Sequence, residues 1–364
     1  MGNEFLYRQP VTIRFGWGKI AELAALLKEQ GADRCLVVCD RFLRSRVEEL
    51  QRDIPEIAAI FSEVEENPQL SGVEGAVELI RDNKVDAVVG MGGGSTMDTA
   101  KFAAAIALGD GEAIDYFRGT RPFPAERLPM IAVPTTAGTG SEVTQVSVIS
   151  CGREKKTINN PVFMPKAALI DPSLTETVPP RTTMNTGLDA MAHALEGYWS
   201  KNHQPVSDLM AVEAVRLVLQ NLEAAYRDGH DRTARENMAL AALLGGLSFA
   251  LPKTAGSHAC SYPLSEDYLP HGEACAFTLD SFVRINADDR LEELCRRAGL
   301  SGTAELGERI RALKQLGGLR TRLSDLGDVD VDKLCHDCAV HPLMNNNPVK
   351  MDEAALRRMF EGLR

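Results

Sequence analysis

The feature that most constrains the fold is an alternation of short apolar runs with amphipathic stretches in the first half of the chain. Apolar runs typical of buried strands occupy residues 34–40, 57–64, 85–91 and 129–136. Apolar residues at helical spacing fill the intervening segments 42–53, 72–83 and 95–108. Strands separated by helices of this length predict a parallel sheet with helices on both faces. Ligands of such sheets bind beyond the carboxyl ends of the strands.

The second half of the chain has a helical pattern. Pro179 and Pro180 close the segment 171–181, and strand-like runs become scarce after it. Apolar residues at helical spacing then fill the segments 182–200, 206–228 and 234–251 and the chain beyond 287. The sequence therefore predicts an α/β domain over residues 1–178 and an all-α domain over residues 179–364.

Charge and hydropathy argue against two classes of partner. A formal charge of −11 does not suit nucleic acid, whose binding depends on clustered Lys and Arg. The chain has no apolar run of the roughly 18 residues that a membrane span needs, and its amino end lacks a signal-peptide core. We therefore expect a cytoplasmic protein. Cys335, Cys338 and His341 form a zinc-like pattern, but no second cysteine pair accompanies them, and we expect them on a helix at the edge of the core.

A glycine-rich segment follows the third expected strand. Residues 90–95 read Gly-Met-Gly-Gly-Gly-Ser and lead directly into an expected helix. Consecutive glycines let the backbone approach an anion, and the amino end of the helix adds unpaired N–H groups. The spacing fits neither G-x-G-x-x-G nor a P-loop, and a tight strand-to-helix turn is the alternative. Its place after a buried strand favours a phosphate-binding loop, in which Asp98 caps the helix.

Hydroxyl-bearing residues follow the next expected strand. The segment 135–142, Thr-Thr-Ala-Gly-Thr-Gly-Ser-Glu, suits hydrogen bonds to phosphate and ribose, although it also suits a loop that caps a helix. Two such loops after neighbouring strands predict one long ligand, such as a dinucleotide, that lies across both loops. Asp40 ends the first expected strand, where a carboxylate accepts a bond from a ribose 2′-hydroxyl and repels a 2′-phosphate. This favours NAD(H) over NADP(H), although aspartate at a strand end also suits a turn.

Four metal-ligating side chains stand in the helical half. Asp189 and His193 are spaced i, i+4 and project from one helix face, and His258 and His271 follow later in the chain. One carboxylate and three imidazoles make a donor set for a divalent ion such as Fe(II) or Zn(II). Each histidine taken singly is more often a core or surface residue than a ligand, and spacing does not show that the four groups converge.

Five motifs in order along the chain resemble the iron-containing alcohol dehydrogenases. They are GGGSTMDTAK (92–101), PTTAGTGSEVT (134–144), DPSLTETVPP (171–180), GLDAMAHALEGY (187–198) and HACSYPL with PHG (258–272). The resemblance implies an amino-terminal dinucleotide-binding α/β domain with a parallel sheet, an all-α carboxyl-terminal domain, and a metal between them. It implies an oxidoreductase that moves hydride between NAD(P) and a small alcohol or aldehyde, and a homodimer as the assembly.

The resemblance also assigns roles to individual residues. Its metal ligands fall on Asp189, His193, His258 and His271. Its nucleotide contacts fall on Asp40, Gly92, Gly93, Gly94, Ser95, Asp98, Thr135, Thr136, Thr139, Ser141 and Lys156. Lys156 also fits an exposed charge in a hairpin. A divalent ion at the predicted ligands would polarise the oxygen of the substrate, which prepares hydride transfer with the nicotinamide.

Two departures from the common family pattern bear on the substrate. Tyr262 stands where many relatives carry a histidine, and a phenol is a poorer proton shuttle near neutral pH. The interval from His258 to His271 also looks shorter than in common relatives. The pattern resembles the phosphonoacetaldehyde reductase branch, so we expect reduction of phosphonoacetaldehyde to 2-hydroxyethylphosphonate. The candidate catalytic residues are Tyr262 and Lys253, and further positive charge for an anionic aldehyde is available from Arg153, Lys155 and Lys156.

Three alternative functions stay open at this point. One is a general short-chain alcohol dehydrogenase of the same family. Another is a dehydroquinate synthase-like lyase, which shares the architecture, NAD and a metal but has different motifs from the segment 134–142. The last is a non-catalytic nucleotide-binding protein, which the complete set of four ligands argues against. The metal bound in the cell and the physiological direction are not fixed by the sequence.

Overall fold

A computed structural model describes residues 4–152 and 154–363 and divides into two compact units. The sheet unit comprises Arg8–Thr136 and Ser141–Thr175. The helical unit runs from Glu176 onward and also includes Ala137–Gly140 and residues 4–7. That the boundary between the two domains follows residue 178 stays a prediction.

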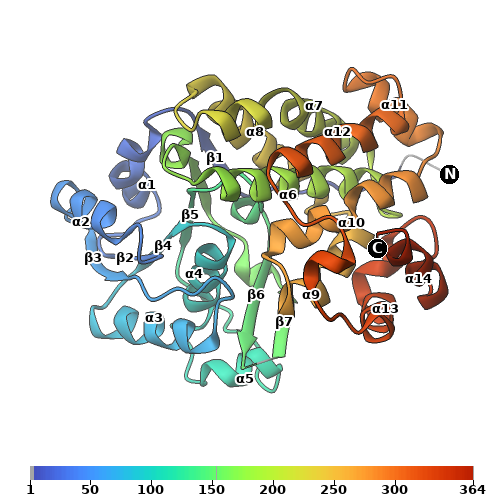
Figure 1. Cartoon of the computed structure of the whole chain (residues 1–364). Coiled ribbons are helices and arrows are strands. Elements are labelled where there is room, and N and C mark those ends of the chain that lie inside the picture. Colours follow the sequence, from blue (N-terminus) through green and yellow to red (C-terminus); the bar gives the residue numbers. More distant parts are fainter. Residues whose placement is uncertain (1–3, 153, 364) are drawn as a thin grey trace. The chain divides into compact units, whose positions relative to one another are not determined.

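Six parallel strands form the sheet in the order β1-β8-β5-β4-β2-β3 (Figure 1). They are β1 (Thr12–Phe15), β2 (Cys35–Cys39), β3 (Ile57–Phe61), β4 (Ala87–Gly92), β5 (Met130–Pro134) and β8 (Ala167–Ile170). The predicted parallel sheet is confirmed. The two strands of this sheet that the sequence pattern missed, β1 and β8, have four residues each.

Helices cover both faces of this sheet because successive strand residues point to opposite sides. Val38 and Val88 pack in one core with three helices, namely α3 (Leu70–Asp82), α4 (Gly94–Ile106) and α5 (Ala113–Arg118). Val37 and Val89 pack in the other core with α1 (Leu23–Glu29) and α2 (Arg44–Asp53). An antiparallel hairpin of β6 (Val146–Cys151) and β7 (Glu154–Asn159) lies against α4 through β6.

The helical unit is built around α6 (Pro180–Trp199), which is buried along most of its length. It packs against α7 (Pro205–Arg227), α8 (Arg232–Phe249) and α10 (His271–Ile285). The remaining helices are α9 (Gly256–Asp267), α11 (Asp289–Arg297), α12 (Thr303–Leu316), α13 (Val331–Val340) and α14 (Glu353–Glu361). The prediction of a helical second half is confirmed.

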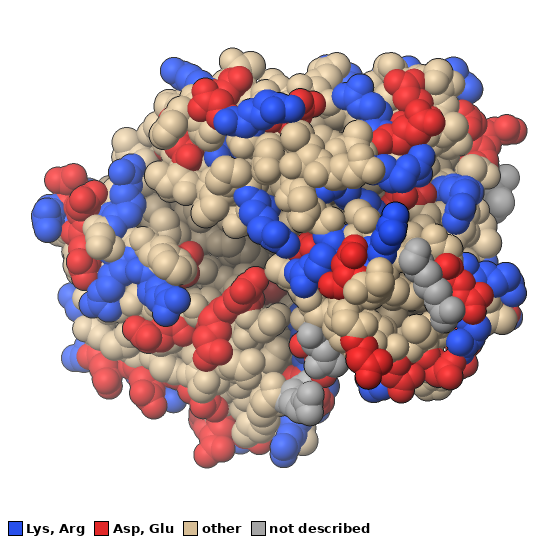
Figure 2. Space-filling view, viewed as in Figure 1, with Lys and Arg blue, Asp and Glu red and all other residues tan. Residues whose placement is uncertain are grey.

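The cysteine pattern near the carboxyl end belongs to α13. Cys335 and Cys338 are buried there, while His336 is exposed and pairs with Glu353 at 2.8 Å. Within the described part of the chain, no helix is long and apolar enough to cross a membrane. On the face shown in Figure 2, acidic and basic side chains are interspersed.

Candidate active site

The predicted nucleotide-binding residues lie at the carboxyl ends of three neighbouring strands, at one edge of the sheet. Asp40 follows β2, Gly92 ends β4, and Thr135 follows β5. The pairs β2–β4 and β4–β5 are both parallel, so these carboxyl ends lie side by side. The chain order also reverses between β2 and β4, since β3 lies outward from β2 and β5 lies outward from β4. Dinucleotides bind at such a reversal in open parallel sheets.

The glycine-rich turn joins β4 to α4 with an open helix end. Gly93 is the extended residue that precedes α4, and no side chain caps this helix. The hydroxyl of Ser95 donates to the carbonyl of Glu66, so Ser95 is engaged with a neighbouring loop. Gly93 faces the side chain of Thr136, while the N–H of Thr135 donates to the carbonyl of Gly92 at 3.0 Å. The two predicted loops are therefore adjacent, and the helix end offers uncapped N–H groups to an anion.

A buried polar network lies beneath these loops. Lys101 Nζ donates to Ser141 Oγ at 2.6 Å and to the carbonyl of Val146 at 2.9 Å. Ser141 in turn donates to Asp98 Oδ1 at 2.9 Å, and Asp98 Oδ2 accepts from the N–H of Val148 at 2.9 Å. Burial lowers the pKa of Lys101 to about 8 and raises that of Asp98. Asp98 thus joins α4 to the following segments and does not cap its own helix.

The other predicted nucleotide contacts have partners within the protein as well. Asp40 Oδ1 accepts from the N–H groups of Phe42 and Leu43 at 2.9 and 3.1 Å, which is a turn role. Lys156 Nζ lies over the ring of Phe117 at 5.0 Å and pairs with Glu154 at 3.4 Å. Thr139 lies in the helical unit, in the segment Ala137–Gly140. The nucleotide roles of these residues stay predictions.

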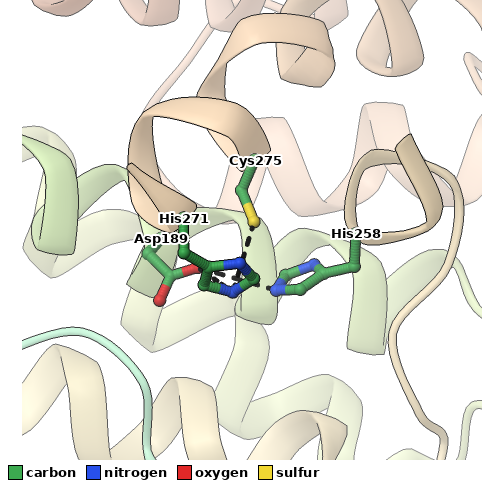
Figure 3. Close-up of side chains that lie close together, drawn as sticks. All are labelled: Asp189, His258, His271 and Cys275. Carbon is green, nitrogen blue, oxygen red and sulfur yellow. Dashed lines mark hydrogen bonds and ion pairs between the residues drawn. The ribbon is translucent and has the colours of Figure 1, made fainter. Parts of the chain in front are cut away.

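Three of the four predicted metal ligands, Asp189, His258 and His271, converge from three helices of the helical unit (Figure 3). Asp189 and His193 stand on α6, His258 on α9 and His271 at the first residue of α10. One ligand atom each from Asp189, His258, His271 and Cys275 forms a group within 4.8 Å of one another. His193 adjoins this group, because its Nε2 lies 3.0 Å from Nε2 of His258. Its ring also stacks on Phe249, with centroids 4.3 Å apart.

The sequence analysis missed Glu196, which orients His258. It lies on α6 seven residues after Asp189 and is fully buried. Its Oε2 lies 2.6 Å from Nδ1 of His258 and accepts from the N–H of Ala255 at 2.9 Å. Because Nδ1 faces a carboxylate, its proton is held there, and Nε2 is the ring nitrogen that would face a metal ion. The sequence does contain a signal for it: Asp189, His193 and Glu196 are spaced i, i+4 and i+7, so all three project from one helix face.

The donor set fits a divalent cation. Oδ1 of Asp189 is buried and has no hydrogen-bond partner among the described residues. Burial raises the pKa of Asp189, but the three imidazoles around it lower that pKa by more than burial raises it. The carboxylate is therefore ionised. Burial lowers the pKa of His193 to about 4, which leaves that ring neutral with a lone pair. A buried carboxylate oxygen that makes no hydrogen bond and faces the Nε2 atoms of His258 and His271 at 3.6 and 4.0 Å belongs to a donor set that a divalent metal satisfies.

Close helix contacts bring the ligands together. A Cβ at Gly272, next to His271, would lie 2.5 Å from the carbonyl oxygen of Asn185 on α6. A Cβ at Gly245 on α8 would lie 3.0 Å from the carbonyl oxygen of Ala190. Glycine at both positions therefore lets α10 and α8 approach the backbone of the helix that carries Asp189 and His193.

Tyr262 lies near the most exposed ligand and stacks on His341, which the sequence pattern had grouped with Cys335 and Cys338. The side chain of His271 is 38% exposed, whereas that of Asp189 is 2% exposed. The ring of Tyr262 lies 6.5 Å from that of His271, centroid to centroid, and stacks on His341 at 4.4 Å. Burial and the charge of His258 lower the pKa of His341 to about 4. His341 follows α13, 66 residues or more beyond the residues of the metal-ligating group in sequence, so no local pattern linked it to them.

Lys253 lies in the turn between α8 and α9 with an unusual backbone. Its φ is +71°, a left-handed value that a residue with a side chain seldom adopts. Its Nζ donates to the carbonyl of Ala250 at 3.2 Å, and burial lowers its pKa. Lys155 donates to Asn67 at 3.3 Å. Arg153, the other predicted source of positive charge, lies outside the described residues.

Comparison with known proteins identifies the family. Residues 10–172 match the family described as iron-containing alcohol dehydrogenase, and residues 183–362 match the carboxyl-terminal domain of that family. The chain belongs to the iron-containing alcohol dehydrogenases. The predicted family is thus confirmed, and it favours an oxidoreductase over the lyase and the non-catalytic alternative.

Relatives of this alcohol dehydrogenase cover the whole chain. The crystal structure of sulfoacetaldehyde reductase from Bifidobacterium kashiwanohense in complex with NAD+ is 40% identical, with a TM-score of 0.95 and coverage of 100% of this chain and 99% of that one. A 1,3-propanediol oxidoreductase structure is 30% identical with a TM-score of 0.91, covering 99% and 100%. Long-chain-alcohol dehydrogenase 1 of Geobacillus thermodenitrificans is 34% identical, covering 97% and 95%.

Proposed function

We propose that this enzyme is an NAD-linked reductase of a two-carbon aldehyde that carries a tetrahedral anionic group, a sulfonate or a phosphonate. The observation that carries the proposal is the 40% identity, along the full chain, to a sulfoacetaldehyde reductase bound to NAD+. Phosphonoacetaldehyde, the substrate expected from the sequence, has the same carbon skeleton and a similar anionic end. Its product would be 2-hydroxyethylphosphonate.

The metal site of the proposed enzyme would be held by the residues around Asp189. Asp189, His193, His258 and His271 are the proposed ligands for Fe(II) or Zn(II). An ion bound there supplies a Lewis acid for the oxygen of the substrate, and a nicotinamide supplies the hydride. Glu196 keeps the Nδ1 proton of His258 in place, which fixes the orientation of that ring. Tyr262 is the proposed hydrogen-bond donor on the exposed side of His271.

The nucleotide is proposed to lie along the sheet edge formed by β2, β4 and β5. Supporting this, the uncapped amino end of α4 and the glycine turn suit the pyrophosphate, and the hydroxyls after β5 suit phosphate or ribose oxygens. Only Oδ1 of Asp40 bonds the turn that follows it. Its second oxygen would accept from a ribose 2′-hydroxyl, so NAD(H) is the proposed cofactor over NADP(H).

Lys253 is the proposed partner of the anionic group. Its half-buried ammonium has three N–H donors, and one of them bonds the carbonyl of Ala250 in its own turn at 3.2 Å, so donors are left for an anion. Its left-handed backbone adds support, because strained residues that persist in a fold cluster at functional positions.

Steady-state kinetics with a small panel of aldehydes test this proposal. Specificity constants would be measured for sulfoacetaldehyde, phosphonoacetaldehyde and acetaldehyde with NADH and with NADPH. We expect an anionic aldehyde with NADH to be preferred. Lys253→Gln and Lys253→Gly should each lose about 10- to 100-fold on the anionic aldehyde, as for a lost charged hydrogen bond, with little change on acetaldehyde. Lys253→Gly suits the left-handed backbone, so it separates loss of charge from loss of fold.

Equal specificity constants for charged and uncharged aldehydes would instead favour the second candidate, a general short-chain alcohol dehydrogenase. The similarity to a 1,3-propanediol oxidoreductase supports that candidate. A homodimer in the cytoplasm remains our proposal for its assembly and location, and sedimentation of the purified holoenzyme tests the dimer.

A further inference from the structure

Cys275 lies among the proposed metal ligands although the sequence motifs assigned it no role. It is buried on α10 four residues after His271, so both side chains project from one helix face. Figure 3 shows its sulfur directed at the point where Asp189, His258 and His271 meet. Its Sγ lies 3.7 Å from Nε2 of His271. Sulfur and nitrogen ligands on one zinc ion would be roughly 3.1–3.6 Å apart, given bonds of about 2.3 and 2.1 Å and bond angles of about 90–110°.

A second observation shows that this point is built for a ligand and not only for packing. Oδ1 of Asp189 is buried and makes no hydrogen bond among the described residues; it faces Nε2 of His258 at 3.6 Å and Nε2 of His271 at 4.0 Å, and it belongs to the same group within 4.8 Å. Cys295 gives the contrast within the same hydrophobic core. It is equally buried on α11, yet it joins no group of metal-ligating side chains found among the described residues.

We propose that Cys275 is a ligand of the metal ion, and that its sulfur makes this site select zinc-like ions over iron. The inference rests on the proposed metal site and deepens it. Thiolate is a soft ligand that suits Zn(II) and Co(II), whereas a site of oxygen and nitrogen donors alone also suits Fe(II). The thiol forms a sulfur–metal bond and gives its proton to the buffer, so no oxidant or reductant is needed.

Cobalt spectroscopy of the purified full-length enzyme tests the ligand. The metal-free protein would be loaded with one equivalent of Co(II), and the spectra of the wild type, Cys275→Ser and Cys295→Ser would be compared. We expect a thiolate-to-cobalt charge-transfer band in the near ultraviolet in the wild type and in Cys295→Ser. Cys275→Ser should bind cobalt without that band. A band that persists in Cys275→Ser would overturn the inference.

X-ray absorption of the zinc-loaded wild type gives a test that needs no variant. One sulfur at about 2.3 Å supports the inference, and a shell of only nitrogen and oxygen overturns it while leaving the other ligands intact. Competition between Zn(II) and Fe(II) under anaerobic conditions tests selectivity. Cys275→Ser should lose at least about 10-fold more affinity for zinc than for iron. A wild type that retains no metal would overturn both this inference and the proposed metal site.

Discussion

Gly272→Ala should weaken metal binding by moving a whole helix. The new Cβ would lie 2.5 Å from the carbonyl oxygen of Asn185, and such contacts are essentially never shorter than 3.0 Å, so α10 and α6 must part by at least 3.0 − 2.5 = 0.5 Å. Metal–ligand distances tolerate only about 0.2 Å. His271 begins α10 and Asp189 stands on α6, so we expect a loss of about 10- to 100-fold in zinc affinity. The overpacking should also lower the free energy of unfolding by about 1–3 kcal/mol.

The assay is competition for zinc against a chromophoric chelator, with urea unfolding of the metal-free protein alongside it. Gly307→Ala on α12 is the matched control, because its Cβ would meet only the flexible end of Arg311 at 3.4 Å. That control should gain about 0.5–1 kcal/mol of stability and bind zinc normally. Unchanged zinc affinity in Gly272→Ala, in a protein that is measurably destabilised, would refute the link between this helix contact and the metal site.

Two further substitutions test the polar groups that hold the site and the loops. Lys101→Met should lower the free energy of unfolding by about 3–5 kcal/mol, because it removes the positive charge 3.8 Å from the buried carboxylate of Asp98. Since burial lowers the pKa of Lys101 to about 8, the unfolded wild type binds that proton more tightly, and denaturant titrations should show the deficit of the variant growing as the pH rises above 8. Glu196→Gln replaces one of two accepting oxygens with an NH2 group, which then meets a donor in either orientation, His258 and Ala255 on one side or Ser257 on the other. Metal affinity should therefore fall about 10- to 100-fold in the chelator assay. Unchanged affinity would mean that the orientation of His258 does not depend on that carboxylate.

The fold was predictable where a segment was long enough to show the periodicity of its apolar residues. The run 34–40 indicated a strand, and Cys35–Cys39 are indeed buried in β2. The edge strand β1 escaped because its four residues are not fully buried and show no continuous apolar run. Helix α9 carries Pro263 inside it, which obscured its pattern. Such elements form because tertiary contacts outweigh local preference.

Only those features of the candidate site that depend on the chemistry of single residues could be predicted from the sequence. Three imidazoles and a carboxylate suggested a metal, but convergence depends on helix contacts such as that of Gly272 with Asn185, which no spacing records. Glu196 was hidden because a glutamate on a helix is ordinarily exposed. Asp98 looked like a helix cap, yet its partners Ser141 and Val148 come from segments more than 40 residues later.

The different exposure of the ligands determines how a substrate can reach the proposed metal. Asp189 and His258 are buried, with side chains 2% and 5% exposed, and Glu196 contacts Nδ1 of His258, the ring nitrogen that does not face Asp189. His271 alone of the four-residue group has a side chain with substantial exposure, at 38%. The oxygen of the proposed aldehyde substrate would therefore arrive on the His271 side, where Tyr262 stacks on His341. We expect this aromatic pair, and not the buried ligands, to distinguish this enzyme from relatives that share the same metal-binding motif.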